Sequence, residues 1–164
     1  MTPELSRPHR VDGLPHGGIT VEVVATPAEC TAVAARLGIP GLRSLVARFQ
    51  LHPAEAGAIA VHATLSARLV RECVVSLDEF EATQRETFKL RFVPAGMEID
   101  DQDPESDDEI PFDGGVIDLG EAAVEQLALD LDPFPRMPGA KLPDEPEPAN
   151  VSPFAALAAL RAKQ

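Results

Sequence analysis

The chain has 164 residues, 45% of them hydrophobic, and a formal net charge of −13. This length and hydrophobic content exclude a wholly disordered chain and fit one domain with tails. The negative charge disfavours generic binding to phosphate backbones and fits either basic protein partners or simply solubility. No run approaches ~20 consecutive apolar residues, and the first residues lack a signal-peptide hydrophobic region, so we expect a cytoplasmic protein without membrane contact.

The first part of the chain predicts a loose leader, a strand and a capped helix. Residues 1–18 carry several prolines and a Gly pair, so we expect them to form a flexible leader. Apolar and polar residues alternate over 19–23, which is the period of a half-buried strand. The run 26–29 predicts a capping box with proline at the first helical position, and this helix should reach about Leu37 with Cys30 on its buried side.

The middle of the chain carries three alternating segments that predict an antiparallel meander with one face on the core. Apolar and polar residues alternate over 45–52, 59–69 and 85–92, with short links between the segments. Their polar positions include five basic side chains, which form a possible RNA-facing surface: Arg48, Arg68, Arg85, Lys89 and Arg91. A solvated sheet face usually carries such charges, so both interpretations stay open.

Two later segments are acidic or rich in proline. Eight acidic residues and no basic residue lie from Glu98 to Glu109, and their mutual repulsion predicts a flexible loop over 96–112. The loop is either a solvated insertion or an electrostatic attraction for basic proteins, effective within ~10 Å at 0.1 M salt. Residues 141–164 are expected to form an acidic, proline-rich linker and a last helix.

The stretch from Gly114 to Ala140 predicts a short strand, a helix and a stiff exit. Asp118 can cap a helix over about 119–131, and Glu121 would complete a capping box. Pro133 has no backbone N–H, so the helix has to stop before it. An apolar stripe at helical spacing predicts the buried face of this helix: Ala123, Val124, Leu127, Ala128 and Leu131.

Three prolines after this helix, at 133, 135 and 138, are expected to hold the residues between them in an extended conformation. In this segment we expect Phe134 to pack the helix exit onto the sheet and Arg136 to reach solvent. The elements together predict an α+β fold, in which an antiparallel sheet of about four or five strands has two helices packed on its inner face. We place this single domain at 19–140.

Two of these stretches carry a family resemblance. The runs IDLGEAAVEQLALDLDPFPRMPGA and RECVVSLDEFEATQRETFKLRFVP, with SPFAALAAL near the C-terminus, resemble the large ribosomal RNA subunit accumulation protein (YceD) family. The resemblance covers roughly Arg43 to Leu160. It implies a role in the synthesis, processing or stability of large-subunit (23S) ribosomal RNA and in ribosome assembly, without an established chemistry.

From this resemblance and the stiff exit we expect a non-enzymatic factor that binds a basic ribosomal protein or a pre-ribosomal particle, with at most an indirect contact to ribosomal RNA. The alternatives are direct RNA binding through the basic sheet face and, from a third class, an uncharacterised enzyme. The residues assigned to partner binding are Asp118, Glu125, Asp132, Pro133, Phe134, Pro135 and Arg136.

The hypotheses of a catalytic site and of a metal site have little support in the sequence. Asp118, Asp130 and Asp132 could be paired carboxylates, but no Ser/His/Asp set, phosphate loop or glycine fingerprint accompanies them. Members of the resembling family often carry a CxxC pair where this chain has VREC, which leaves only Cys73. One thiolate does not complete a tetrahedral zinc site. We therefore expect no catalytic residue, no metal and no cofactor.

Overall fold

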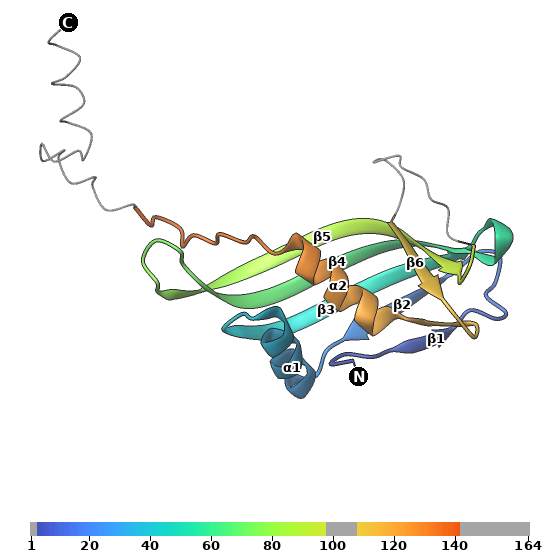
Figure 1. The fold of residues 1–164 in the computed structure, drawn as a ribbon, viewed down its shortest axis with the longest axis horizontal. Helices are drawn as coiled ribbons and strands as arrows, with labels where there is room; N and C mark the ends of the chain where they lie inside the picture. Colours follow the sequence, from blue (N-terminus) through green and yellow to red (C-terminus); the bar gives the residue numbers. More distant parts are fainter. Residues whose placement is uncertain (1–2, 98–107, 142–164) are drawn as a thin grey trace, which may run out of the picture.

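The computed structural model describes residues 3–97 and 108–141, which contain a five-stranded sheet with helices on one face. The strand order is β2-β3-β4-β5-β6, antiparallel except for the parallel pair β5–β6. The predicted α+β class is confirmed (Figure 1). The strands of this sheet are β2 (Ile19–Val24), β3 (Gly41–Pro53), β4 (Ile59–Glu72), β5 (Glu79–Pro94) and β6 (Asp108–Phe112).

The register of the long strands separates an apolar inner face from a polar outer face. Arg48 of β3 lies opposite Thr64 of β4, which lies opposite Thr87 of β5. Because side chains alternate along a strand, the odd-numbered neighbours in β3 and β4 point to the other face, where the helices cover them. The inner face forms the core, and its buried members include Leu45, Ala47, Phe49, Leu51, Val61, Leu65, Leu69, Phe88, Leu90 and Phe92.

Helix α1 (Pro27–Leu37) begins and ends as the sequence predicts. The Thr26 hydroxyl accepts the N–H of Glu29, and the Glu29 carboxylate accepts the N–H of Thr26, so the capping box is complete. Gly38 ends the helix in a left-handed conformation with φ 64°. The buried side of the helix includes Cys30, which packs in the core as a small apolar residue.

Helix α2 (Leu119–Asp130) is capped by Asp118, whose carboxylate accepts the N–H groups of Gly120 and Glu121 at 2.9 and 3.2 Å. The expected capping box is incomplete, because the Glu121 carboxylate bonds Arg36 of α1 at 2.6 Å. The predicted buried stripe is wrong at Ala128, which is exposed. The buried face lies nearer the start of the helix and comprises Leu119, Gly120, Ala122, Ala123, Val124, Gln126 and Leu127.

The N-terminal segment belongs to the folded domain, so the expectation of a loose leader over 1–18 is wrong for its described part. Strand β1 (Pro8–Arg10) pairs antiparallel with β7 (Val116–Asp118) in a second, two-stranded sheet. Leu5 is fully buried in the core. The Ser6 hydroxyl and the Arg7 N–H both donate to the Asp118 carboxylate, at 2.5 and 2.8 Å. The alternating strand that the sequence showed at 19–23 is therefore the second strand of the chain.

The expectation of a flexible loop over 96–112 is wrong for its last five residues, which form β6. Ile110 and Phe112 are half-buried against the core, and this burial fixes the segment beside the end of β5. Residues 98–107 and the linker and last helix expected over 142–164 lie outside the described residues. Within the described ranges, no helix is both long enough and apolar enough to cross a membrane.

Candidate functional site

The segment that follows α2 is docked on the end of the β4–β5 hairpin. Three hydrogen bonds hold it there. The Arg71 guanidinium donates to the carbonyl of Asp132 at 2.5 Å, and the Val74 N–H donates to the carbonyl of Pro135 at 2.9 Å. The Met137 N–H donates to the Cys73 Sγ at 3.3 Å. Two stretches that lie about 60 positions apart in the sequence therefore meet in the fold.

Hydrogen bonds within this segment form a turn at each of its ends. The Asp132 carboxylate accepts the N–H of Phe134 at 2.8 Å, which turns the chain immediately after the helix. At the other end the Ala140 N–H donates to the carbonyl of Met137 at 3.0 Å, with Gly139 at φ 82°. Proline at the second position and glycine at the third are the residues that a type II turn prefers. The segment is therefore stiff and lies between two turns. We call residues 131–141 the strap.

The sequence led us to expect that Phe134 packs onto the sheet. This expectation is wrong, because Phe134 is 70% exposed. The reason is the alternation of an extended chain. Pro135 and Met137 face the hairpin and are half-buried, so Phe134 and Arg136 point away from it and are exposed. Arg136 therefore reaches solvent, as predicted, and it makes no ion pair within residues 3–97 and 108–141.

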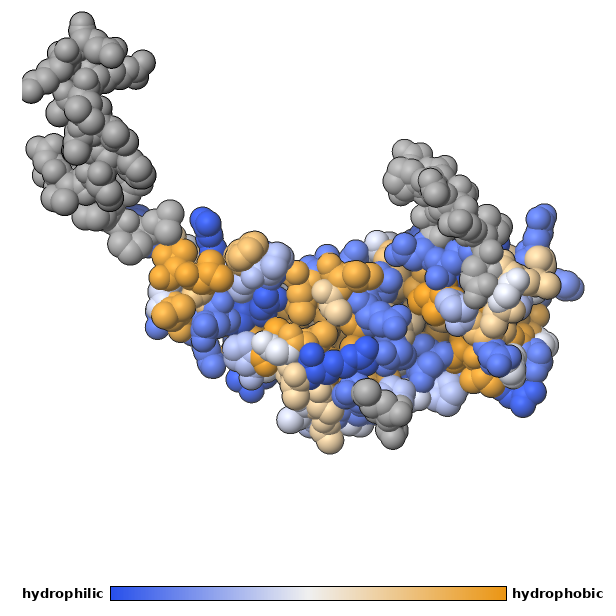
Figure 2. All heavy atoms as spheres, in the orientation of Figure 1, coloured by the Kyte–Doolittle hydropathy of each residue, from blue (hydrophilic) through white to orange (hydrophobic). Residues whose placement is uncertain are grey.

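Apolar side chains of the hairpin turn are exposed beside this strap. Leu77 is 70% exposed, with a left-handed φ of 63°, and Val74 is 44% exposed. Figure 2 shows hydrophobic side chains gathered at the end of the molecule where the β4–β5 turn and the segment after α2 meet. We call Val74, Leu77, Phe134 and Arg136 the exit surface. The sequence predicted only its last two members.

Cys73 is buried in the contact between the strap and the hairpin. Its thiol is inaccessible, and the backbone N–H groups of Met137 and Ser76 that point at the sulfur lower its pKa to about 7, although burial opposes the shift. His52 and His62 lie on the outer face of the sheet, opposite Cys73, as the strand register requires. Over the described ranges, no group of three or more His, Cys, Asp or Glu residues is placed to hold a metal ion.

Two of the residues assigned to partner binding lie apart from the strap. Asp118 stands at the start of α2, roughly 18 Å from the exit at 1.5 Å rise per residue. Burial would raise the pKa of its carboxyl, but hydrogen bonds from Ser6 and from the Arg7 backbone outweigh burial and lower it. Glu125 is exposed in the middle of the helix, where desolvation and the nearby Glu121 raise its pKa. Asp132, Pro133, Phe134, Pro135 and Arg136 all lie in the strap. Asp118 instead caps α2 and binds the N-terminal segment.

Sequence reasoning missed the hairpin residues that receive the strap. Arg71 is 9% exposed and its guanidinium is committed to the Asp132 carbonyl. A signal for it was present, because RECVVSLDEF belongs to one of the two stretches that carry the family resemblance. No local pattern, however, indicates that this stretch contacts the other.

The outer face of the sheet carries all five basic residues that the alternation placed there. Three of them are already neutralised by ion pairs: Arg48 with Glu22 at 2.9 Å, Arg68 with Glu81 at 3.5 Å and Arg91 with Glu109 at 3.5 Å. Within the described part of the chain, Arg85 and Lys89 make no ion pair.

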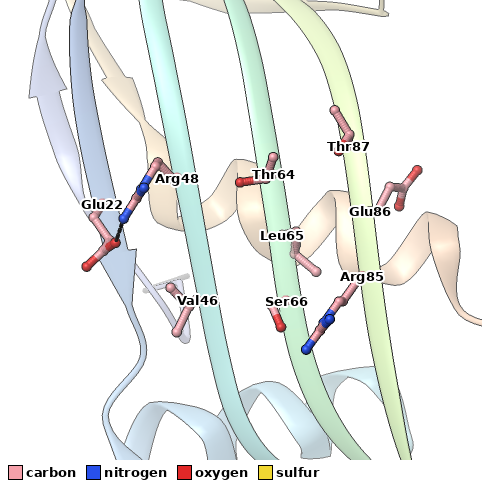
Figure 3. Close-up of a pocket in the computed structure, with 9 residues that line it drawn as sticks. All are labelled: Glu22, Val46, Arg48, Thr64, Leu65, Ser66, Arg85, Glu86 and Thr87. Atoms are coloured by element: carbon pink, nitrogen blue, oxygen red, sulfur yellow. Dashed lines mark hydrogen bonds and ion pairs between the residues drawn. The ribbon is translucent and has the colours of Figure 1, made fainter.

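A hollow of about 400 Å³ lies on this outer face between β2 and β5. Figure 3 shows Arg85 extending from β5 towards Ser66 of β4, while Arg48 pairs with Glu22 at the other side of the hollow. The lining offers hydroxyl groups, the Arg85 guanidinium and the ion pair of Arg48 with Glu22, so it carries charges of both signs. Its side chains come from Glu22, Val46, Arg48, Thr64, Ser66, Arg85 and Thr87.

A family model matches the part of the chain that contains the strap and its hairpin. The fold is an α+β domain in which Phe134, the most exposed aromatic side chain among the described residues, lies on a strap fixed to a hairpin. The model of the family described as large ribosomal RNA subunit accumulation protein YceD matches residues 61–161, from β4 through both partners of the strap–hairpin contact. The match spans more than half of the chain, so the chain belongs to this family, as the resemblance indicated. Its description implies a role in the accumulation of large-subunit ribosomal RNA.

Comparison with curated proteins and with solved structures found no match.

Proposed function

We propose that this protein supports the synthesis, processing or stability of large-subunit ribosomal RNA without catalysing a reaction, by binding a protein partner of the assembling ribosome through the exit surface. Family membership supports the role in RNA accumulation. The protein contact and the surface are inferred from the residues at the end of α2.

The observation that carries the proposal is the exposure of Phe134 on a backbone that is fixed at Asp132, Pro135 and Met137. Aromatic side chains that become fully buried in a partner pocket supply much of the binding energy of protein interfaces. Ordering a flexible segment costs free energy on binding, and this segment is ordered in advance by prolines and three hydrogen bonds. An aromatic anchor with a low ordering cost is what a recognition segment needs.

The charge around the exit surface indicates the chemistry of the partner. Asp78 and Asp132 are exposed beside it, and the whole chain carries a net charge of −13. A negative surface accelerates encounters with basic proteins and slows encounters with nucleic acid. A basic ribosomal protein, free or on a pre-ribosomal particle, is therefore the proposed partner, with ribosomal RNA contacted at most indirectly.

A photo-crosslinking amino acid in place of Phe134 tests this proposal in growing cells. We expect crosslinks to a basic protein that co-sediments with large-subunit particles. The matched control is the same amino acid in place of Leu129, which is 74% exposed on α2 and lies outside the exit surface. Equal crosslinking from both positions would contradict a specific protein contact at the exit surface.

Direct RNA binding is the second candidate. Arg85 and Lys89 on the outer face favour it, because they make no ion pair within residues 3–97 and 108–141. Two phosphate contacts predict a logarithmic salt slope of only about −1.4 for single-stranded RNA. Replacing both residues by alanine should abolish RNA binding if the outer face is responsible, and should leave crosslinking from position 134 unchanged. RNA crosslinks from position 134 itself would overturn the protein-contact proposal.

A further inference from the structure

Within the described part of the chain, strand β5 leaves most of one sheet edge without a partner. It pairs with β4 along residues 79–92, but β6 pairs only with residues 90–94 on the other side. Among the described residues, no other strand pairs with residues 79–89, and no backbone hydrogen bond from a loop reaches them. Figure 1 shows β5 as the border of the sheet, with β6 beside only its last part.

This open edge is long and regular. It extends from Glu79 to Lys89, and the β4–β5 register contains no shift. Along an open edge, alternate residues direct their N–H and C=O groups away from the sheet, and these groups pair readily with another extended chain. Proteins commonly shorten, bend or cover such an edge. The edge of β5 is neither short nor interrupted by a bulge, so its length is available to a partner strand.

The charges of β5 identify that partner. On the outer face the strand begins with Glu79 and Glu81 and continues with Arg85 and Lys89. When a second β5 runs antiparallel beside the first, the acidic half of each strand faces the basic half of the other. A parallel arrangement would place like charges side by side, which is destabilising.

We propose that two copies of this chain join through antiparallel pairing of their β5 edges. Two five-stranded sheets then form one continuous sheet around a two-fold axis. The inference goes beyond the proposed function and uses no residue of the exit surface. A two-fold contact uses the same strand on both copies, so its charges have to be self-complementary, and those of β5 are.

The length of the open edge sets the register. Pairing over all of residues 79–89 requires the axis to pass through the midpoint, Gln84. Glu79 then lies opposite Lys89 of the second copy, twice per dimer. On the inner side Phe80 lies opposite Phe88 of the second copy, an aromatic pair of the kind that stabilises antiparallel strands.

Charge reversal tests this pairing in the full-length chain by sedimentation equilibrium at low salt. We expect the wild type to be dimeric at tens of micromolar. Glu79→Lys and Lys89→Glu should each weaken the dimer about tenfold, because each creates two like-charge pairs. The double variant should recover wild-type affinity to within a few-fold.

The recovery of dimer affinity in the double variant cannot come from a contact between positions 79 and 89 of the same chain. Positions 79 and 89 are ten residues apart on one strand, which is roughly 33 Å at 3.3 Å per residue. Glu55→Lys in the turn before β4 makes the same change in net charge away from this edge and should leave the dimer intact. Circular dichroism confirms that each variant is folded.

A crosslink gives a second, independent measurement of the register. Because Gln84 lies on the proposed axis, Gln84→Cys chains should form an intermolecular disulfide under mild oxidation, and Glu55→Cys chains should not. A monomeric wild type at 100 μM would overturn the proposal and would show that the edge has another occupant, such as a peptide of a different protein. A double reversal variant no tighter than the single variants, or no Gln84 crosslink, would overturn it as well.

Discussion

Two proline-containing segments, residues 3–14 and residues 131–141, lie at opposite ends of α2, and they are held in different ways. The first is held through both backbone and side chains: β1 pairs with β7 and the Leu119 N–H donates to the Arg7 carbonyl, while Leu5 lies in the core and the Ser6 hydroxyl donates to Asp118. The second is held through its backbone, because Arg71, Val74 and Cys73 bond main-chain atoms of the strap. Side chains of the first segment therefore contact the folded domain, whereas the second segment leaves Phe134 and Arg136 exposed to solvent.

This difference explains why both expectations from composition were wrong. Prolines and glycines suggested looseness at the N-terminus, and an aromatic residue suggested burial at the helix exit. The deciding factor is whether side chains as well as backbone atoms carry the contacts. The N-terminal segment adds buried side chains to its backbone pairing, whereas the strap is bonded through its backbone and can present side chains to a partner.

The largest effect we expect is from Leu5→Ala. Leu5 is fully buried, so its truncation should lower the free energy of unfolding by about 2–5 kcal/mol. Urea unfolding measures this change. Leu129→Ala, at a leucine that is 74% exposed, is the matched control and should cost less than about 0.5 kcal/mol. Equal, small costs at both positions would mean that the N-terminal segment is a loose leader after all.

Gly120→Ala tests the same packing through the backbone. Alanine normally stabilises a helix interior by about 1 kcal/mol relative to glycine. At this position a Cβ would lie 2.7 Å from the Leu5 carbonyl oxygen and 2.9 Å from the Arg7 nitrogen. We expect a loss of about 1–3 kcal/mol instead of a gain, measured by urea unfolding. Ala128→Gly, on the exposed side of α2, reports the propensity effect alone, and a stabilised Gly120→Ala protein would contradict the close approach.

Acid should weaken the N-terminal anchor. The Arg7 guanidinium and the Thr26 N–H lower the pKa of Glu29 from its ordinary value of 4.5 to about 2. Because the pKa is lower in the folded state, this stabilisation is present above pH 4.5 and is lost as the pH falls towards 2. We expect Glu29→Gln to flatten the fall in unfolding free energy across that window. An unchanged pH profile would show that the Arg7–Glu29 pair does not hold the segment.

The smallest expected effect on stability is at the strap. Arg136→Ala should leave the melting temperature within about 2 °C of wild type, because the side chain is exposed and makes no ion pair within the described residues. It should nevertheless reduce large-subunit RNA accumulation in a complementation strain. Full complementation by this variant would remove Arg136 from the functional surface.

The sequence predicted the elements better than it predicted their contacts. Strand alternation, the Thr26 capping box and the Pro133 helix stop are local signals, and they located the long strands and both helices. The pairing of β1 with β7 and the docking of the strap depend on residues far apart in the chain. No pattern within a short window encodes such contacts, so Leu5 and Arg71 were missed.

For the candidate site, the prolines correctly indicated a stiff extended segment, but the orientation of Phe134 depended on which backbone atoms bond the hairpin. The alternation that turns Pro135 and Met137 inward turns Phe134 outward. Asp118 shows the opposite case. Its capping role was predicted correctly, and the two further donors from Ser6 and Arg7 make it a residue of the fold.

The central claim is that the strap displays Phe134 for a partner and does not need it for folding. Phe134→Ala tests this claim most directly, with melting temperature and large-subunit RNA accumulation measured for the same protein in a complementation strain. We predict a melting temperature within about 2 °C of wild type and a loss of RNA accumulation, while Leu129→Ala retains both. A stable Phe134→Ala protein that fully restores RNA accumulation would contradict the claim.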